Sequence, residues 1–325
     1  MPVKMKVCNV ADYTESLRKR GNIFSFFEKT IEVWYHNVVE ECERSKYIYS
    51  EPLIELLAIL RYLCKTPFRQ LTGMLENYIT NVKGLELPIP DPSTLCRRMK
   101  KAAGFIYDFR TEEEKNKDSV EIAIDSSGIN IYHTDGGHSK KNKKVRKESH
   151  YDQVRKLHVT LDLESKMVLS MEMTSGTTHD SQPVVDLLDN IDENIDKIYA
   201  DSAYDNKNIR EQCYDRGAEQ VIPPKRNGVI KKTKNNKRSL WDERNNAIKI
   251  MNAHDNKDDG LVAWKKSVGY GKRALVEGFF SRFKRISGFH FMSKNEDARK
   301  NELITKVNIL NYFTHLGQAL YERVI

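Results

Sequence analysis

Apolar residues in the first third of the chain recur at the three- and four-residue spacing of amphipathic helices. Three segments there begin with the same device, a side chain that can cap a helix followed by proline in the first turn: Ser50 with Pro52, Thr66 with Pro67, and Asp91 with Pro92. We therefore predict an all-helical N-terminal domain over residues 1–112, with its last three helices starting near residues 51, 67 and 92.

These three helices are typical of a helix-turn-helix-like unit that binds DNA. The third would face the DNA and extend to about residue 109, with Arg97 and Arg98 on it. The connection over residues 81–90 is longer than the usual tight turn, so a plain helical bundle with a solvated basic face remains the alternative.

After a charged linker, "RTEEEKNKDS", the pattern changes to alternation of apolar and polar residues. Strands are predicted over 119–133, in a hairpin over 155–177 that turns at 164–166, and over 196–205 and 218–224. Helices are predicted over 181–191 and over 206–217, the latter closed by Gly217. This order predicts an α/β domain with a mixed sheet over residues 118–325, with a basic inserted segment around 225–265.

Composition narrows the class of partner and compartment. With 54 Lys and Arg against 46 Asp and Glu the formal charge is +8, which favours an acidic partner, nucleic acid first. The five cysteines form no C-x-x-C pair, as expected of a reduced protein without a disulfide framework or zinc site. The longest apolar stretch, residues 52–60, is too short to span a membrane, so we expect a cytoplasmic protein.

Two predicted strands deliver an aspartate followed by serine. Asp125 lies in "IAIDSSG" and Asp201 in "IYADSAYD", and Glu277 comes from a later helical segment. Three carboxylates suit two Mg²⁺ ions, which prefer oxygen ligands and stabilise the attacking and leaving oxygens of phosphoryl transfer. An aspartate after a strand is also common as a helix cap or turn residue, so the two aspartates alone do not decide between these readings.

The segment "YGKRALVEGFFSRFK" surrounds Glu277 with cations. Tyr270, Arg273, Glu277 and Lys284 follow one another at intervals of three, four and seven residues, which places them on one face of a helix. An ordinary Arg–Glu pair on an exposed helix is the alternative. Cations beside a metal-binding carboxylate fit a site whose other partner is a phosphate backbone.

The spacing Y-x2-R-x3-E-x6-K, together with the two Asp strands, resembles the signature of bacterial insertion-sequence transposases of the DDE class. The resemblance implies an RNase H-like catalytic fold with two Mg²⁺ or Mn²⁺ ions held by Asp125, Asp201 and Glu277. It further implies that Tyr270, Arg273 and Lys284 contact the phosphates of the transposon end. The implied partners are double-stranded DNA, as terminal inverted repeats and target, and a second copy of the chain in a homodimeric DNA complex in the bacterial nucleoid.

The expected function is therefore that of a DNA transposase. It would bind the ends of its insertion sequence, cleave them by metal-assisted phosphodiester hydrolysis and join the 3′ ends to target DNA. A nuclease without strand transfer, or a catalytically idle DNA-binding protein derived from a transposase, are the alternatives.

Several further residues have two readings. Asp180 is expected to cap the helix that starts at Ser181 rather than to take part in acid–base chemistry. Trp241 and Trp264 flank the inserted segment and are expected to pack in the core, with stacking on an unpaired base as the alternative. The basic run over residues 138–156 is either a solvated loop or a phosphate contact.

Overall fold

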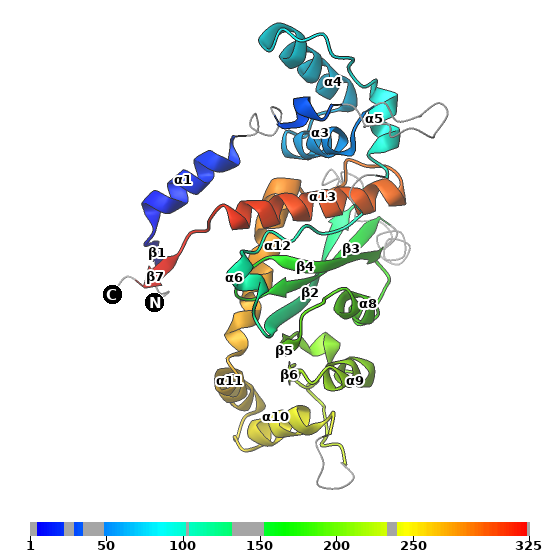
Figure 1. Cartoon of the computed structure of the whole chain (residues 1–325). Coiled ribbons are helices and arrows are strands. Elements are labelled where there is room, and N and C mark those ends of the chain that lie inside the picture. Colours follow the sequence, from blue (N-terminus) through cyan, green and yellow to red (C-terminus); the bar gives the residue numbers. More distant parts are fainter. Residues whose placement is uncertain are drawn as a thin grey trace, which may run out of the picture. The chain divides into compact units, whose positions relative to one another are not determined.

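The computed structural model describes residues 5–22, 29–34, 49–101, 104–131, 153–232 and 239–323. The chain forms two compact units: residues 1–107 with 286–325, and residues 108–285 (Figure 1). We expected a helical domain over 1–112 and a catalytic domain over 118–325. The structure instead groups the C-terminal 286–325 with the helical N-terminal residues.

The described part of the first unit is formed by helices, the loops between them and a small two-stranded sheet. Its helices are α1 (Val10–Arg20), α3 (Glu51–Leu63), α4 (Phe68–Glu76) with its π-helical extension η1 (Asn77–Val82), α5 (Pro92–Arg98) and α13 (Glu296–His315). Strands β1 (Met5–Val7) and β7 (Tyr321–Arg323) pair in antiparallel orientation. The predicted helical character of this region is confirmed.

Local capping explains where two of these helices begin. The Ser50 side chain accepts a hydrogen bond from the backbone N–H of Leu53, and Asp91 accepts one from Ser93. The predicted cap at Thr66 was wrong, since α4 begins after Pro67 without a side-chain cap. Helix α5 ends at Arg98 and is shorter than the predicted helix to about residue 109.

The core of this unit forms where α3, α4 and α5 turn their apolar faces toward one another. Its fully buried members include Leu53, Leu57, Leu71, Ile79 and Leu95. Helix α13 contacts α3, although more than 230 residues of chain separate them. No described helix is both long enough and apolar enough to cross a membrane.

The second unit is built on a five-stranded mixed sheet. Its strands are β2 (Val120–Asn130), β3 (Val154–Asp162), β4 (Val168–Ser175), β5 (Ile195–Tyr199) and β6 (Glu219–Val221). They lie in the order β4-β3-β2-β5-β6, with β4, β3 and β2 antiparallel and β2, β5 and β6 parallel. This is the RNase H-like arrangement, so the predicted fold class is confirmed.

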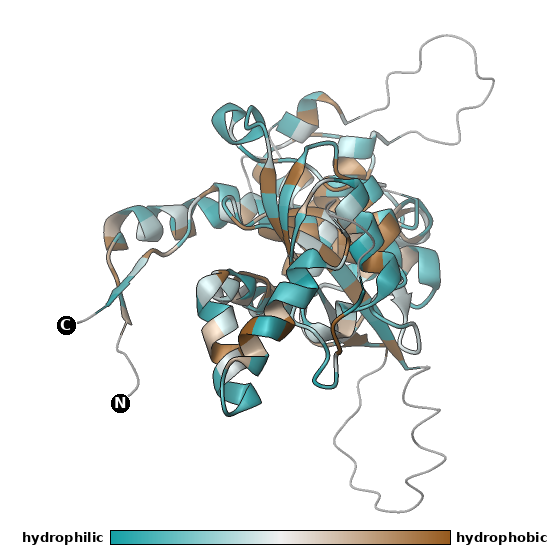
Figure 2. Ribbon diagram, turned by 90° about the horizontal axis from the view of Figure 1, so that it is seen from below, coloured by the Kyte–Doolittle hydropathy of each residue, from teal (hydrophilic) through white to brown (hydrophobic). Residues whose placement is uncertain are grey.

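Helices α8 (Val184–Asp189) and α9 (Lys207–Asp215) pack on this sheet. They share a core with the strands in which Ile122, Ile124 and Ile198 are fully buried. The hydropathy colouring shows hydrophobic and hydrophilic residues interspersed along both strands and helices, as expected of elements with one buried side (Figure 2). Gly217 follows the C-cap residue Arg216 of α9 and adopts a positive φ of 74°, and it closes that helix as predicted.

The rest of this unit is helical. It comprises α6 (Glu112–Lys115), α10 (Asp242–Asn252), α11 (Lys257–Ser267), the 3-10 helix η3 (Tyr270–Arg273) and α12 (Ala274–Ser287). The predicted charged linker thus contains a short helix, which starts with a capping box between Thr111 and Glu114. The inserted segment is more regular than its composition indicated, because α10 and α11 contact each other within it.

Candidate active site

Three carboxylates reach one place from three separate elements. Asp125 lies within β2, Asp201 lies two residues beyond the end of β5, and Glu277 lies in the first turn of α12. Strands β2 and β5 are parallel neighbours, and their register pairs Ala123 with Tyr199. Since each aspartate lies two residues beyond that pair, the sheet itself brings Asp125 and Asp201 side by side.

The guanidinium of Arg273 lies among the three carboxylates. Its Nη2 is 2.9 Å from Oδ2 of Asp125 and 4.0 Å from Oδ2 of Asp201, and its Nη1 is 2.6 Å from Oε1 of Glu277. The structure therefore brings together four of the residues that the sequence singled out. The Arg–Glu pair at i,i+4 that we weighed as an alternative is present, but it is one part of a larger charged cluster.

Exposure differs strongly across this cluster. The Asp125 side chain is 16% exposed, Asp201 is 41% exposed and Glu277 is 61% exposed. Burial raises the pKa of Asp125 above its ordinary value, although Arg273 acts in the opposite direction. The charges of Asp201 and Glu277 raise that pKa further, because a like charge nearby disfavours ionisation. The site thus favours an added cation.

Backbone hydrogen bonds hold both aspartates in place. Oδ1 of Asp201 accepts from the N–H of Ala203 at 2.8 Å and so caps the 3-10 helix η2 (Ser202–Tyr204). Oδ1 of Asp125 accepts from the N–H of Ser126 at 2.9 Å. In each residue one oxygen is used locally while Oδ2 faces Arg273. For Asp201 the helix cap therefore does not exclude the predicted metal-binding role, because the cap uses only Oδ1.

Tyr270 does not lie on the α-helical face that the sequence predicted for it. Residues Tyr270–Arg273 form a 3-10 helix before α12, so no single α-helical face carries all four motif residues. The Tyr270 hydroxyl donates to the carbonyl of Ala200 at 3.2 Å, and its ring packs 5.6 Å from that of Trp264. Tyr270 thus braces the chain next to Asp201. The core position predicted for Trp264 is confirmed.

Asp180 does not cap a helix, which corrects our prediction. Helix α8 begins at Val184, after Pro183. Oδ1 of Asp180 instead accepts from Oγ of Ser126 and from Nζ of Lys156, each at 2.9 Å. Both partners lie on the sheet far away in sequence, so no local signal could have indicated this role.

Asp205 is a buried charged residue that the sequence analysis did not single out. Asp205 accepts hydrogen bonds from Nε of Arg210 at 2.8 Å and from Nε of Arg244 at 3.0 Å. Burial alone would raise the pKa of Asp205, yet the neighbouring arginines and a backbone N–H lower it below its ordinary value. This group ties the loop that follows Asp201 to α10 of the inserted segment.

The two arginines of α5 have different environments. Arg97 is exposed, whereas Arg98 is buried, pairs with Glu51 and donates to the carbonyl of Tyr49 at 3.0 Å. The prediction that Arg98 faces DNA was therefore wrong, because the helix turns that side chain toward α3. The basic run over 138–156 lies mostly outside the described residues, so its two readings stay open.

The donor chemistry of the three carboxylates fits a divalent cation. Carboxylate oxygens are the ligands that Mg²⁺ and Mn²⁺ prefer. As the side chains lie, no three His, Cys, Asp or Glu residues of the described chain are grouped closely enough to hold an ion. Arg273 lies between the carboxylates, and Glu277, the most exposed of them, has the most room to approach the other two.

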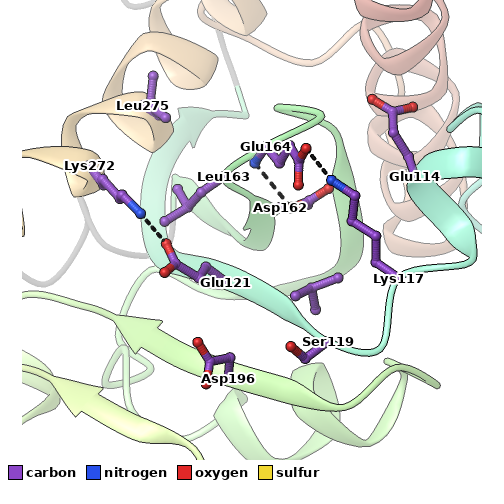
Figure 3. A pocket seen from close by; sticks show the side chains of 11 residues that line it. Glu114, Lys117, Ser119, Glu121, Asp162, Leu163, Glu164, Asp196, Lys272 and Leu275 are labelled. Atoms are coloured by element: carbon purple, nitrogen blue, oxygen red, sulfur yellow. Dashed lines mark hydrogen bonds and ion pairs between the residues drawn. The ribbon is translucent and has the colours of Figure 1, made fainter.

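A cavity of about 470 Å³ lies at the other end of β2 (Figure 3). Its lining carries more acidic than basic side chains: Glu114, Glu121, Asp162, Glu164 and Asp196 against Lys117 and Lys272. Both lysines are ion-paired, Lys117 with Glu164 and Lys272 with Glu121. A lining of this charge is unfavourable for phosphate, so we do not place DNA there.

Two protein-family models match this chain. A family model described as a transposase DDE domain matches residues 116–312, and a second model of the same description matches residues 18–134. The first match alone spans more than half of the 325 residues and includes all three carboxylates.

Some solved structures are distantly similar. The piggyBac transposase synaptic complex with hairpin DNA matches at a TM-score of 0.38 and 11% identity, over 93% of this chain and 74% of that one. The Drosophila P element transposase strand transfer complex matches at 0.33 and 13% identity, over 86% and 70%. The Mos1 paired-end complex matches at 0.22 and 12% identity, over 60% and 65%. TM-scores this low support no argument about this chain.

Proposed function

Because this chain belongs to the transposase DDE domain family and is thus a DNA transposase, we propose that Asp125, Asp201 and Glu277 are its metal ligands. The observation that carries the proposal is the convergence of these three carboxylates on one guanidinium from three different elements. We propose Mg²⁺ or Mn²⁺, two ions per site, as the cofactor. The reaction we propose is cleavage at the element's terminal repeats and joining of the 3′ ends to target DNA.

Each carboxylate is held by its element in a way that suits this reaction. Asp125 is fixed within β2 between β3 and β5, and Asp201 is fixed by its bond to Ala203. Rigid first ligands keep the reacting phosphate in one position relative to the sheet. Glu277 enters from a helix and is largely exposed, so it faces the side from which a polyanion approaches. The bound ions would stabilise the attacking and leaving oxygens of the displacement.

Phosphate contacts are proposed for Arg97, Arg273 and Lys284. Arg97 is exposed on α5, and Lys284 lies half-exposed in the last turn of α12. Cations at such positions neutralise phosphates, which gives affinity with a strong salt dependence. Tyr270 is proposed to act indirectly, by bracing Ala200 beside Asp201. Two copies of the chain, one per element end, are proposed from the family resemblance.

Substitution of each ligand tests the assignment. We expect Asp125→Asn, Asp201→Asn and Glu277→Gln each to lower DNA cleavage by more than about a hundredfold. Binding to terminal-repeat DNA in gel shifts should stay near the wild-type level, because these changes remove charge with little change of shape. Asp196→Asn is the matched control, since Asp196 is exposed on the same strand that precedes Asp201 but lines the distant cavity.

Wild-type cleavage by any one of the three variants would remove that residue from the site. Formation of joined DNA product separates a transposase from a nuclease. If the wild-type chain nicks the element ends but never joins them to target DNA, the strand-transfer part of the proposal is wrong. An idle protein would bind the ends and neither cut nor join them.

A further inference from the structure

Two arginines of the second unit pair with carboxylates in contrasting ways. Arg210 is fully buried, and its Nε, Nη1 and Nη2 bond to Asp205, Gln220 and the carbonyl of Ile222 at 2.8, 2.9 and 3.1 Å. Arg273 binds carboxylates through its two Nη atoms, while its Nε is buried without a partner among the described residues. Arg210 has the saturated bonding of a structural arginine, and Arg273 does not.

The charge count at Arg273 is also unbalanced. One guanidinium faces three carboxylates, so the cluster carries an excess of negative charge as it stands. The three contacts are unequal: 2.6 Å to Glu277, 2.9 Å to Asp125 and 4.0 Å to Asp201. The shortest one goes to the most exposed carboxylate, and exposed ion pairs contribute little to stability. Arg273 is thus held at a place where a cation is needed, and its contact with the exposed Glu277 is easily exchanged.

We propose that Arg273 is the resident cation of the metal-free site, which keeps the three carboxylates together and must leave them when divalent ions bind. This inference rests on the proposed metal-binding role of Asp125, Asp201 and Glu277. Arg273 is a positioning residue in this state, because it acts through the carboxylates. Since its guanidinium and the ions compete for the same oxygens, its presence weakens metal affinity.

The exchange gives Arg273 a second partner. A guanidinium released from the carboxylates lies next to the ions and can form bidentate bonds with a DNA phosphate. Its orphaned Nε then also becomes available as a donor. The Arg273 side chain would thus keep the three carboxylates together in the absence of metal and, once ions are bound, face the transposon end.

If Arg273 and metal ions compete for the carboxylates, removing the guanidinium should raise the affinity for metal. Mn²⁺ binding to the metal-free, full-length protein is measured by electron paramagnetic resonance of the free ion, without DNA. We expect Arg273→Gln to bind Mn²⁺ about tenfold more tightly than wild type, which corresponds to about 1.4 kcal/mol. Arg273→Lys should fall between the two, because an ammonium offers a single point of contact in place of the planar fork.

Lys272→Gln is the matched control, since the neighbouring Lys272 pairs with Glu121 and not with the site. Its Mn²⁺ affinity should equal that of wild type within about twofold, a change of ~0.4 kcal/mol. Melting without metal gives a second readout. Arg273→Gln should melt several degrees below wild type in chelator, because the carboxylates then repel one another, and Mn²⁺ should raise its melting temperature more than that of wild type.

Unchanged or weaker Mn²⁺ binding by both Arg273 variants would overturn the inference, since a purely structural arginine would leave a disordered, weaker site when removed. That result would leave the proposed function intact as long as Asp125→Asn still lowers Mn²⁺ affinity. If Asp125→Asn, made in the Arg273→Gln background, leaves Mn²⁺ binding unchanged, the metal assignment itself fails.

Discussion

His158 is a fully buried histidine on β3 whose protonation state bears on stability. Its Nε2 lies 2.8 Å from Oγ1 of Thr174, and its Nδ1 is buried without a partner among the described residues. Burial lowers the pKa of His158 from its ordinary value of 6.5 to about 4, with Asp180 raising it and Lys156 lowering it further. The ring is therefore neutral in the native protein at pH 5, whereas the unfolded chain is protonated there.

The unfolded state thus binds more protons between pH 6.5 and pH 4, so stability falls as the pH falls through this window. We expect His158 to contribute a loss of about 2 kcal/mol in unfolding free energy between pH 7 and pH 5. Denaturant unfolding at the two pH values measures it. His158→Gln keeps a polar side chain near Thr174 and should lose most of this pH dependence. An equal loss in the variant would assign the effect to other groups.

Helix α5 places two adjacent cations, Arg97 and Arg98, on different faces. Arg98 points inward to Glu51 and the Tyr49 carbonyl. Arg97 is exposed, and among the described residues it makes only a long contact of 3.4 Å to Oγ1 of Thr94. Adjacent residues lie on different faces of a helix. Two neighbouring arginines therefore do not both face DNA when one of them is turned toward the core. The position of each arginine on the helix therefore decides whether its side chain is buried or exposed.

Single substitutions should therefore separate stability from DNA binding. We expect Arg98→Ala to lower the unfolding free energy by about 2 kcal/mol, because it removes a buried side chain and leaves the Tyr49 carbonyl without its donor. Arg97→Ala should melt like wild type but bind terminal DNA more weakly, with the salt slope reduced by about one. Melting curves and gel shifts at several salt concentrations measure both. If Arg98→Ala keeps its melting temperature and loses DNA binding, the assignment of the two arginines is reversed.

At the scale of the whole molecule, the N-terminal helices depend on the C-terminal end of the chain. Helix α13 belongs to the same compact unit as residues 1–107 and contacts α3. The Asn308 side chain donates to the carbonyl of Phe105 at 3.1 Å and accepts from the N–H of Tyr107 at 2.9 Å. Lys306 lies 5.6 Å from the centre of the Tyr62 ring.

A fragment of residues 1–112 lacks these contacts and leaves apolar surface of α3 uncovered. We expect it to unfold without a cooperative transition in circular dichroism and to bind terminal DNA weakly. Joining residues 1–107 to 286–325 through a flexible linker should restore cooperative melting, and residues 108–285, which hold the five-stranded sheet, serve as the control. Cooperative melting of 1–112 by itself would show that α13 is dispensable for this unit.

Local pattern predicted much of the fold. Alternation of apolar and polar residues indicated β2 and the β3–β4 hairpin, and capping side chains such as Ser50 and Asp91 indicated where helices begin. The spaced motif and the two Asp strands indicated Asp125, Asp201, Glu277 and Arg273 as one cluster, and the structure brings these four together. The strands, the caps and the spacing of Arg273 and Glu277 depend on residues near one another in sequence, so the sequence by itself determined them. The meeting of Asp125 with Asp201 was implied by the family resemblance and depends on the pairing of β2 with β5.

Only the tertiary structure decided which side chains face which partner. The burial of Arg98, the bonds of Asp180 to Ser126 and Lys156, and the Asp205–Arg244 pair all join residues about 25 to 55 positions apart. The placement of residues 286–325 beside the N-terminal helices spans almost the entire chain. Such pairings leave no periodic trace in the sequence, because they follow from which apolar faces pack together. A charged residue becomes a surface cation or a buried brace only once that packing has set its surroundings.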